Sequence, residues 1–590
     1  MIFTIREILR FLQPYRRSII VALITMLLVD VFAYVVPGAL AHITDVVYPA
    51  IMNGEPSAMR SLWLSAGFIA ATAIARGIAI HIMIRAFWFT AESTVRDIRN
   101  ALYAKLQHLE ISYYDTAQTG DLMSRATYDI QLIRNFIAFG IEHRVRIALI
   151  GITIFILMLA QDWRLALAIY TIIPLFAYAI MHYGGRMRSA VVVQQRQMGQ
   201  LNSHLQESVT GIRVTKAFAV EEEAIARFDD ENRSMLQRDL DAALPQAYLT
   251  PVLLVTEGVA ALVLLVVGGY RVINGDAQLG TIVAFIIYLG IMSFPLRILA
   301  FNTALINLAR GAAGRINEIL HTPDQTRHDS GSRRDRIIGR LSFDDVSFRY
   351  GTGPCVLENI SFDVEPGSHI GIFGLTGAGK STLISLIPRF YLPTSGQICV
   401  DGMPIEEWDL QTLRGQVGTV LQETFLFSAT IRENIGFGRE NATMDDIEQA
   451  ARAAEIHDFI MSLPRGYETM VGEYGVGLSG GQRQRIAIAR TIVQDPRILI
   501  LDDCTSSLDA VTERQILEQL KHLMRDRTTI IVAQRLSTLS LADRVIVLEN
   551  GNLQAIDHHD NLILNNDLYR RTWRQQRPGK QFETGEESWR

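Results

Sequence analysis

One stretch of the chain has the residue types and the spacing of a phosphate-binding loop. It fits the pattern G-x-x-x-x-G-K-[ST] and reads Gly374, Leu375, Thr376, Gly377, Ala378, Gly379, Lys380, Ser381, Thr382. The glycines of such a loop let backbone N–H groups converge on phosphate oxygens at a helix N-terminus. Lys380 would reach the terminal phosphates, and Ser381 would ligate Mg²⁺. The sequence therefore predicts a nucleotide site.

A second string lies downstream and reads Leu478, Ser479, Gly480, Gly481, Gln482. Together with the loop, it resembles the signature of the ATP-binding cassette (ABC) family. The resemblance implies a head-to-tail sandwich of two cassettes, in which each ATP lies between the phosphate-binding loop of one and the signature of the other. It therefore places Ser479, Gly480, Gly481 and Gln482 against the nucleotide of a second cassette.

Composition points to a membrane protein of several domains. The chain has 590 residues, 49% of them hydrophobic, and a formal net charge of -5. The apolar residues gather in long runs in the first half, as in membrane spans. The charge gives no support to nucleic-acid binding, which requires a basic patch.

Six apolar runs are candidates for membrane-spanning helices. They cover about residues 18–40, 61–83, 145–160, 165–183, 249–270 and 279–299. Residues 1–17 precede them as a short interfacial helix that ends near Pro14, because a proline interrupts helical hydrogen bonding. The N-terminus lacks the pattern of a secretory signal peptide. We predict an all-α membrane domain over residues 18–310, in the cytoplasmic (inner) membrane.

The connections between these runs differ strongly in length. Residues 161–164 and 271–278 are short, whereas 84–144 and 184–248 are long, amphipathic and rich in Arg and Lys. The positive-inside rule places the long connections, both termini and the second half of the chain in the cytosol. Long helical extensions would carry the spans as rods beyond the bilayer.

Two stretches in these connections resemble the coupling segments of family exporters. The first comprises residues 113–125, including Tyr113, Tyr114 and Asp115, and the second comprises residues 211–218. The resemblance implies that they dock on cassettes. Read from the residues alone, each could equally be a solvated helix turn.

Four polar residues lie within the predicted spans: Asp30, Arg76, His81 and Glu257. Burying charge in lipid is expensive, so such groups face a cavity or a partner. Asp30 and Glu257 could contact a substrate or pair with another helix.

The second half of the chain has the pattern of an α/β domain. A polar linker covers residues 311–340, and alternating strand and helix patterns follow over residues 341–571, with a polar tail at 572–590. Tyr350 follows a predicted strand and matches the family's adenine-stacking aromatic. The three cysteines, Cys355, Cys399 and Cys504, have no metal-type spacing. We expect them to be free, buried thiols.

Further matches complete the predicted ATP site. Gln422 matches the family residue that senses Mg²⁺ and the attacking water. Residues 498–502 form an apolar run that ends in Asp502, which would hold hydrated Mg²⁺ at the mouth of a parallel strand. Residues 506–509 resemble the loop that crosses to the other cassette.

Two departures from the family pattern affect the same catalytic centre. Asp503 stands where hydrolysing members have glutamate, and Gln534 stands where they have histidine. Aspartate is one methylene shorter, and general-base geometry tolerates little displacement. Glutamine cannot bring a positive charge to the γ-phosphate. The pair predicts a site that binds ATP well and hydrolyses it slowly.

The sequence therefore predicts one half of a heterodimeric exporter, with ATP and Mg²⁺ as cofactors. A second, different half-transporter would supply the glutamate and the histidine, and this chain would supply the signature to that active site. Alternatives are a homodimeric slow ATPase, an exporter-fold importer for siderophore-like substrates, and a channel or sensor. The substrate, whether a small molecule, lipid or peptide, is not encoded in a readable motif.

Overall fold

The computed structural model describes residues 10–324, 331–422, 424–472, 477–503, 518, 521 and 524–576. It divides into two compact units, and each is described by itself. The helical unit comprises residues Met1–Gln107 and Gln118–Thr322. The cassette unit comprises His108–Ala117 and Pro323–Arg590. The predicted crossing loop at 506–509, Cys504 and residues 1–9 of the predicted interfacial helix lie outside the described residues.

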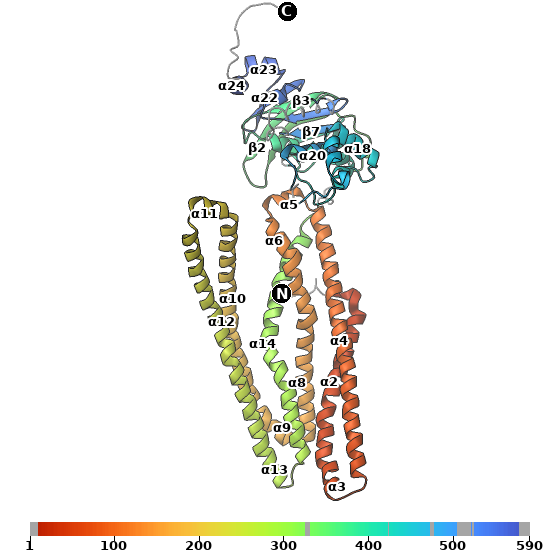
Figure 1. Ribbon diagram of the computed structural model, residues 1–590, viewed down its shortest axis with the longest axis vertical. Coiled ribbons are helices and arrows are strands. Elements are labelled where there is room, and N and C mark those ends of the chain that lie inside the picture. The colour runs from red at the N-terminus through yellow and green to blue at the C-terminus, as the bar shows by residue number, and fades with distance from the viewer. Residues whose placement is uncertain are drawn as a thin grey trace, which may run out of the picture. The chain divides into compact units, whose positions relative to one another are not determined.

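Six long helices form the helical unit (Figure 1): α2 (Arg16–His42), α4 (Ala58–His108), α8 (Glu142–Gln161), α10 (Ile173–Thr210), α12 (Glu221–Val263) and α14 (Leu279–His321). Short elements complete it: η1 (Gln13–Tyr15), η2 (Ile43–Val47), α3 (Tyr48–Met52), α6 (Thr119–Ser124), η3 (Arg125–Asp129), α7 (Ile130–Asn135), η4 (Phe136–Ile141), α9 (Trp163–Tyr170), α11 (Ile212–Phe218), η5 (Leu264–Gly268) and α13 (Gly269–Ile273). Pro14 lies in the 3₁₀ turn η1, after which the chain continues directly into α2.

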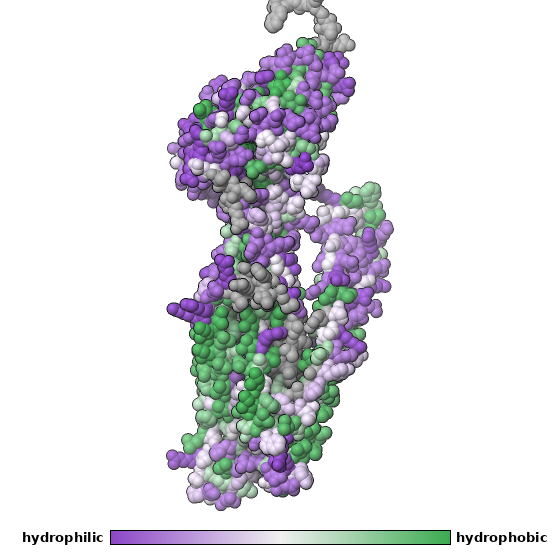
Figure 2. All heavy atoms as spheres, turned by 180° about the vertical axis from the view of Figure 1, so that it is seen from behind, coloured by the Kyte–Doolittle hydropathy of each residue, from purple (hydrophilic) through white to green (hydrophobic). Residues whose placement is uncertain are grey.

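The helical segments confirm the predicted membrane domain. Five of them are long and apolar enough to cross a bilayer: Arg10–Met52, Ala58–His108, Thr119–Gln161, Trp163–Thr210 and Glu221–Ile273. The sixth, α14, contributes the shorter apolar stretch Leu279–Met292 among its described residues. Hydrophobic side chains form a broad band on the face of the unit that Figure 2 shows. At 1.5 Å per residue, the 51 residues of α4 exceed a bilayer core of about 30 Å, so the helix continues beyond it.

An ion pair joins the two short connections at one end of the unit. Asp162 accepts hydrogen bonds from the backbone N–H groups of Arg164 and Leu165, so it caps α9. Its carboxylate also binds Arg271, with Nη1 at 2.5 and 2.6 Å from the two oxygens. Asp162 therefore fixes both short connections on the same side of the helices.

Ion pairs also tie the opposite ends of the long helices together. Arg315 on α14 binds Asp129 through Nε and Nη2 at 2.7 and 2.5 Å. Arg125 reaches both Asp121 and Glu318, at 2.8 and 3.1 Å. Arg315 and Glu318 lie in the last part of α14, because this helix continues past residue 311 and ends at His321. The first part of the predicted linker is thus helical.

The cassette unit contains two sheets. One has the strand order β2-β1-β4-β5, from β1 (Leu341–Arg349), β2 (Cys355–Val364), β4 (Ser395–Val400) and β5 (Met403–Pro404). The other has the order β10-β9-β3-β8-β7-β6, from β3 (His369–Phe373), β6 (Val417–Val420), β7 (Ile498–Asp502), β8 (Thr528–Val532), β9 (Arg544–Glu549) and β10 (Asn552–Asp557). Alternate residues of β7 face two separate apolar clusters, so this sheet is buried on both faces.

Helices and short helical turns complete this unit. They are α5 (Ile111–Thr116), α15 (Lys380–Leu386), η7 (Ile405–Glu407), α16 (Leu410–Gln416), α17 (Ile431–Gly436), α18 (Met444–Ala453), α19 (His457–Ser462), η8 (Gly466–Glu468), α20 (Gly480–Gln494), α22 (Leu536–Leu539), α23 (His559–Asn565) and α24 (Asp567–Gln576). Trp573 of α24 belongs to the apolar core, so ordered structure extends beyond residue 571. Cys355 and Cys399 are free but only half-buried, on β2 and β4.

Parallel pairing aligns the ends of four strands. Val532 of β8 lies opposite Ile372 of β3 and opposite Asp502 of β7. Val420, the last residue of β6, lies opposite Leu501. The loops that follow these strands therefore leave the sheet at one edge, where ligands of open α/β sheets bind.

We expect Asp162→Ala to destabilise the helical unit by about 1–3 kcal/mol, because it removes a helix cap and leaves Arg271 without its carboxylate. Thermal unfolding of the protein in lipid nanodiscs would measure the change. Asp276→Ala is the matched control, because Arg271 contacts only the backbone oxygen of Asp276. Equal unfolding temperatures for the two variants would contradict a structural role for this ion pair.

Candidate nucleotide site

The predicted phosphate-binding loop connects β3 to α15 in a conformation that depends on glycine. Gly377 and Gly379 have φ angles of +85° and +96°, which favour glycine. A Cβ atom on Gly374 would lie 2.5 Å from the carbonyl oxygen of Leu548. Ala378 is buried, whereas Thr376 and Ser381 are exposed. The loop thus has the open backbone cradle that phosphate oxygens require.

Lys380 lies folded back onto this loop. Its Nζ donates to the carbonyl oxygens of Gly374 and Leu375, at 2.7 and 3.0 Å. Burial lowers the pKa of the Lys380 ammonium, and the carboxylates of Asp503 and Asp502 oppose that shift. A terminal phosphate would give Lys380 a stronger, charged acceptor than these carbonyls.

Two adjacent carboxylates are buried beside Lys380. Asp502 is 9% exposed and Asp503 is 6% exposed. Burial raises the pKa of Asp502, and the neighbouring charge of Asp503 raises it further, while Lys380 lowers it. Burying two like charges is costly, and a divalent cation would relieve that cost. The donor set therefore fits hydrated Mg²⁺ held by Asp502 with Ser381.

Asp503 has an unusual backbone conformation. Its φ is +42°, and its N–H donates to the carbonyl oxygen of Val532 at 2.8 Å. Non-glycine residues in this region cost about 1–3 kcal/mol and cluster at functional sites. The short side chain therefore starts from a fixed position at the edge of the sheet.

Gln422 and Gln534 follow β6 and β8, and both are exposed. Since the parallel strands end together, both residues emerge at the edge that carries Asp502 and the phosphate-binding loop. Thr382 is buried in α15, and its Oγ1 lies 3.1 Å from the hydroxyl of Tyr350. The structure thus gathers these predicted residues around one site.

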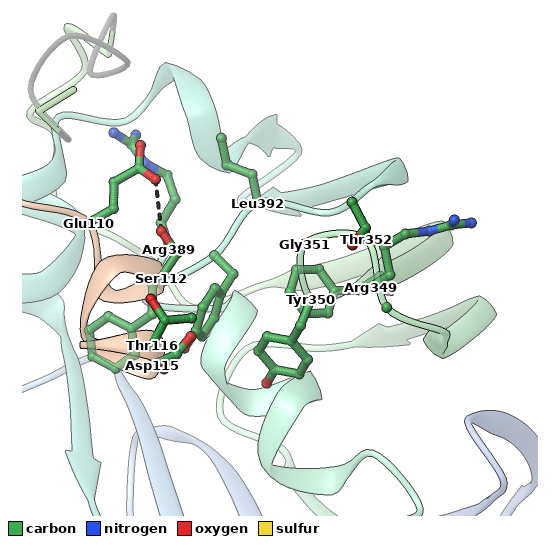
Figure 3. A pocket seen from close by; sticks show the side chains of 14 residues that line it. Glu110, Ser112, Asp115, Thr116, Arg349, Tyr350, Gly351, Thr352, Arg389 and Leu392 are labelled. Carbon is green, nitrogen blue, oxygen red and sulfur yellow. Dashed lines mark hydrogen bonds between the residues drawn. The ribbon is translucent and has the colours of Figure 1, made fainter. Parts of the chain in front are cut away.

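A pocket of about 840 Å³ extends from Tyr350 to the first predicted coupling segment. Glu110, Ser112, Asp115 and Thr116 line one side, and residues 349–352 line the other (Figure 3). Tyr391 lies between them: its hydroxyl donates to Asp115 at 2.8 Å, and its ring meets that of Tyr350 edge-on at 5.2 Å. Burial and the Asp115 carboxylate raise the pKa of Tyr391. Helix α5 therefore belongs to the cassette unit through a specific contact.

The signature string forms the N-terminus of α20. Ser479 and Gln482 make a capping box, with Gln482 N–H donating to Ser479 Oγ at 3.3 Å and Ser479 N–H donating to Gln482 Oε1 at 2.8 Å. Ser479 and Gly480 are exposed, and Gly481 is half-buried. A Cβ atom added to Gly480 would meet nothing within 4 Å. The signature is therefore a formed helix end that faces open space.

The helical unit contains a separate polar cluster. A cavity of about 230 Å³ is lined by Asp30, Arg76, Glu142, His143 and Arg146, together with apolar residues. Arg146 lies 3.5 Å from Asp30 and 3.4 Å from Glu142, and His143 pairs with Glu142. Asp30 thus both pairs with another helix and borders a cavity. His81 and Glu257 do not line it.

Sequence reasoning missed two residues of the cassette. Tyr391 contacts Asp115, and Gln576 bonds the backbone around Gln534. The aromatic run Phe390-Tyr391 was the only sequence signal for the first, and the second lies in the predicted tail. Both contacts join residues far apart in the chain.

We expect Asp502→Asn to make the thermal stabilisation by ATP independent of Mg²⁺, because the variant lacks the carboxylate that fits the cation. Unfolding temperatures with ATP, measured with Mg²⁺ and with EDTA, would test this. For the natural protein, EDTA should remove part of the stabilisation. Lys380→Ala should weaken the ATP effect in both conditions. A Mg²⁺ effect retained by Asp502→Asn would assign the cation to other residues.

Comparison with known proteins agrees with this architecture. Residues 19–296 match the model of the ABC transporter transmembrane region, and residues 357–506 match the ABC transporter model. The ABC transporter ATP-binding protein YknU of Bacillus subtilis (strain 168) is 36% identical over 97% of both chains. The ATP-dependent lipid A-core flippase of Syntrophus aciditrophicus (strain SB) is 36% identical over 82% of this chain and 80% of its own.

A solved structure shares the fold over nearly the whole chain. It is that of a bacterial Atm1-family ABC exporter with ATP bound, with a TM-score of 0.81 and 26% identity. The superposition covers 96% of this chain and 99% of the other. With a helical transmembrane domain fused to one ATP-binding cassette, this chain belongs to the ABC transporter family and is a half-transporter of the exporter type.

Proposed function

We propose that this chain is the slow-site half of a heterodimeric exporter driven by ATP. ATP binding would close two cassettes and turn the membrane cavity outward, and hydrolysis at the partner's site would reset it. Such alternating access is a population shift driven by ligand binding. The observation that carries the proposal is the difference, within one cassette, between an open signature and an altered catalytic centre.

The catalytic centre supports a slow site. Asp503 is buried, and its backbone is anchored to Val532, so its shorter side chain has little freedom to approach an attacking water. Gln534 is a neutral residue at the adjacent loop. Mg²⁺ bound at Asp502 would offset phosphate charge, so ATP binding itself needs neither residue in its family form.

The signature supports a role in the partner's site. Ser479 and Gln482 satisfy each other, and the first N–H groups of α20 face outward at the positive end of a helix dipole. Gly480 leaves room for the close approach of a phosphate. We infer that the occupant is ATP on the phosphate-binding loop of the second chain.

The second predicted coupling segment supports a dimer. Helix α11 exposes an apolar set at its tip: Ile212 is 49%, Val214 is 61% and Phe218 is 74% exposed. Its last turn ends at Ala219 in the left-handed conformation, which makes a tight return into α12. We infer that this apolar face docks on the partner's cassette, while α5 docks on the cassette of its own chain.

The intramembrane cavity suggests a class of substrate. Arg146 and His143 form ion pairs with the two carboxylates. The Nε of Arg76 is buried without a hydrogen-bond partner among the described residues, as are the Nε of Arg146 and the Nδ1 of His143, and no ion pair is found for Arg76 among these residues. We propose that Arg76 binds an anionic group of an amphiphile whose apolar part contacts Ile147, Ile150 and Ile291. The flippase relative is named for a lipid, lipid A-core. We also propose that both termini and the cassette lie in the cytosol, on the side of the long basic connections.

We expect Gly480→Ala to abolish most ATP turnover by the heterodimer, because the added methyl group would hold the partner's γ-phosphate away from the N–H donors of the helix end. Loss of a transition-state donor there costs about 2.7–4 kcal/mol. Asp503→Asn should change steady-state turnover little. Phosphate release by the purified pair would measure both.

Gly415→Ala is the matched control for this comparison. Gly415 also lies in a helix, and a Cβ atom there also meets nothing within 4 Å. If Asp503→Asn abolished turnover as fully as Gly480→Ala, Asp503 would be a working base and the asymmetric mechanism would be wrong.

We also expect Arg76→Gln to reduce stimulation of the ATPase by an anionic amphiphile about tenfold, a change of about 1.4 kcal/mol in binding. A zwitterionic amphiphile with the same acyl chains should lose much less. ATPase activity in nanodiscs titrated with each amphiphile would distinguish them. Equal losses for both would exclude anion recognition by Arg76.

A further inference from the structure

The loop that carries Gln534 lacks a cap of its own. It connects the last residue of β8, Val532, to the four-residue helix α22, which begins at Leu536. The residue before that helix, Arg535, provides no side-chain cap. The N–H groups of a first helical turn need acceptors from outside the helix. The position of Gln534 therefore depends on contacts with another part of the chain.

The amide of Gln576 supplies those contacts. Its Nε2 donates to the carbonyl oxygen of Gln534 at 2.8 Å, and its Oε1 accepts from the N–H of Leu536 at 2.9 Å. One side chain thus bonds the backbone on both sides of Arg535. The amide offers a donor and an acceptor on the same carbon, whereas an ionised glutamate has only acceptors and leucine has neither, so neither of these could make both bonds.

Helix α24 is anchored by its buried face, and Gln576 is the exposed last residue of this helix. Tyr569 is fully buried and Trp573 is 8% exposed. They are four residues apart, and Gln576 follows Trp573 by three, so the three side chains share one side of the helix. The Tyr569 hydroxyl also pairs with His559 Nδ1 of α23 at 2.7 Å. The amide of Gln576 is therefore presented by an anchored helix.

The same helix contacts the strand that leads into the phosphate-binding loop. The ring of Tyr569 packs edge-on against Phe373, with centroids 4.9 Å apart. Phe373 ends β3 and precedes Gly374 directly. Helix α24 thus makes two contacts at the site. It packs against β3, which leads into the phosphate-binding loop, and it forms hydrogen bonds with the loop that contains Gln534.

We infer that Gln576 is a positioning residue of the nucleotide site: it fixes the backbone at Gln534 so that this side chain meets the γ-phosphate of ATP. The inference rests on the proposed role of Gln534. If Gln576 has this role, helix α24 contributes to the geometry of the nucleotide site. Without the amide, the loop would sample other conformations, and the contribution of Gln534 to ATP binding would be lost.

The test compares ATP with ADP, because only ATP has the γ-phosphate. The full-length chain in nanodiscs is titrated with Mg-ATP and Mg-ADP, and the preference for ATP is the ratio of the two dissociation constants. We expect Gln576→Leu to lower this preference about three- to tenfold, the effect of one or two hydrogen bonds, and to leave ADP binding unchanged. Gln576→Glu should behave similarly, because a carboxylate faces the Gln534 carbonyl.

Gln575→Leu is the matched control, because this exposed neighbour makes neither bond. Gln534→Ala measures the contribution of the loop residue itself, and the double variant with Gln576→Leu should be no worse than Gln534→Ala alone. If Gln534→Ala lowered the ATP preference and Gln576→Leu did not, the inference would be overturned. If Gln534→Ala had no effect, the proposed role of Gln534 would fail instead.

Discussion

The parallel pairing of β3, β8, β7 and β6 is the constraint on which the nucleotide site depends. Val532 is matched at once to Ile372 and Asp502, and Val420 is matched to Leu501, so four loops begin at the same level. A shift of one residue in any of these strands would move its loop along the edge and turn each of its side chains to the opposite face of the sheet. The apolar clusters on both faces of the sheet prevent such a shift. Core packing and the chemistry of the site are therefore specified together.

The nucleotide site buries charged groups at an electrostatic cost, and a bound ligand can lower that cost. Asp502 and Asp503 are buried as adjacent like charges. The ammonium of Lys380 donates its hydrogen bonds to neutral carbonyl groups of its own loop. Nucleotide with a divalent cation would supply the missing opposite charges to both groups. Under the proposed function, ATP would bind chiefly through groups that keep their family form, and Gln534 would add a contact with the γ-phosphate. The changes at Asp503 and Gln534 would slow hydrolysis more than they weaken binding.

The helical unit is stiffened at both ends by charge pairs. Asp162 with Arg271 closes the end with the short connections, and Asp129 with Arg315 closes the other. Between them lies the cluster of Asp30, Glu142 and Arg146, whose charges cross between helices. Long helices held in this way can transmit a displacement along their length. Under the proposed function, the apolar tip of α11 would pass such a displacement to the partner's cassette.

The sequence by itself determined the fold class, the membrane spans and the identity of the nucleotide motifs. Those features depend on local pattern: glycine spacing in the phosphate-binding loop, an apolar run that ends at Asp502, and runs of apolar residues long enough for a bilayer. The assignment of roles to individual site residues remains a prediction. Only the tertiary structure decided that α14 continues to His321, that Asp30 pairs with Arg146, that Asp503 has a positive φ, and that Gln576 bonds the loop at Gln534. Each of these results from contacts between residues distant in the chain or from the backbone geometry that such contacts impose, and no local pattern of residue types encodes them.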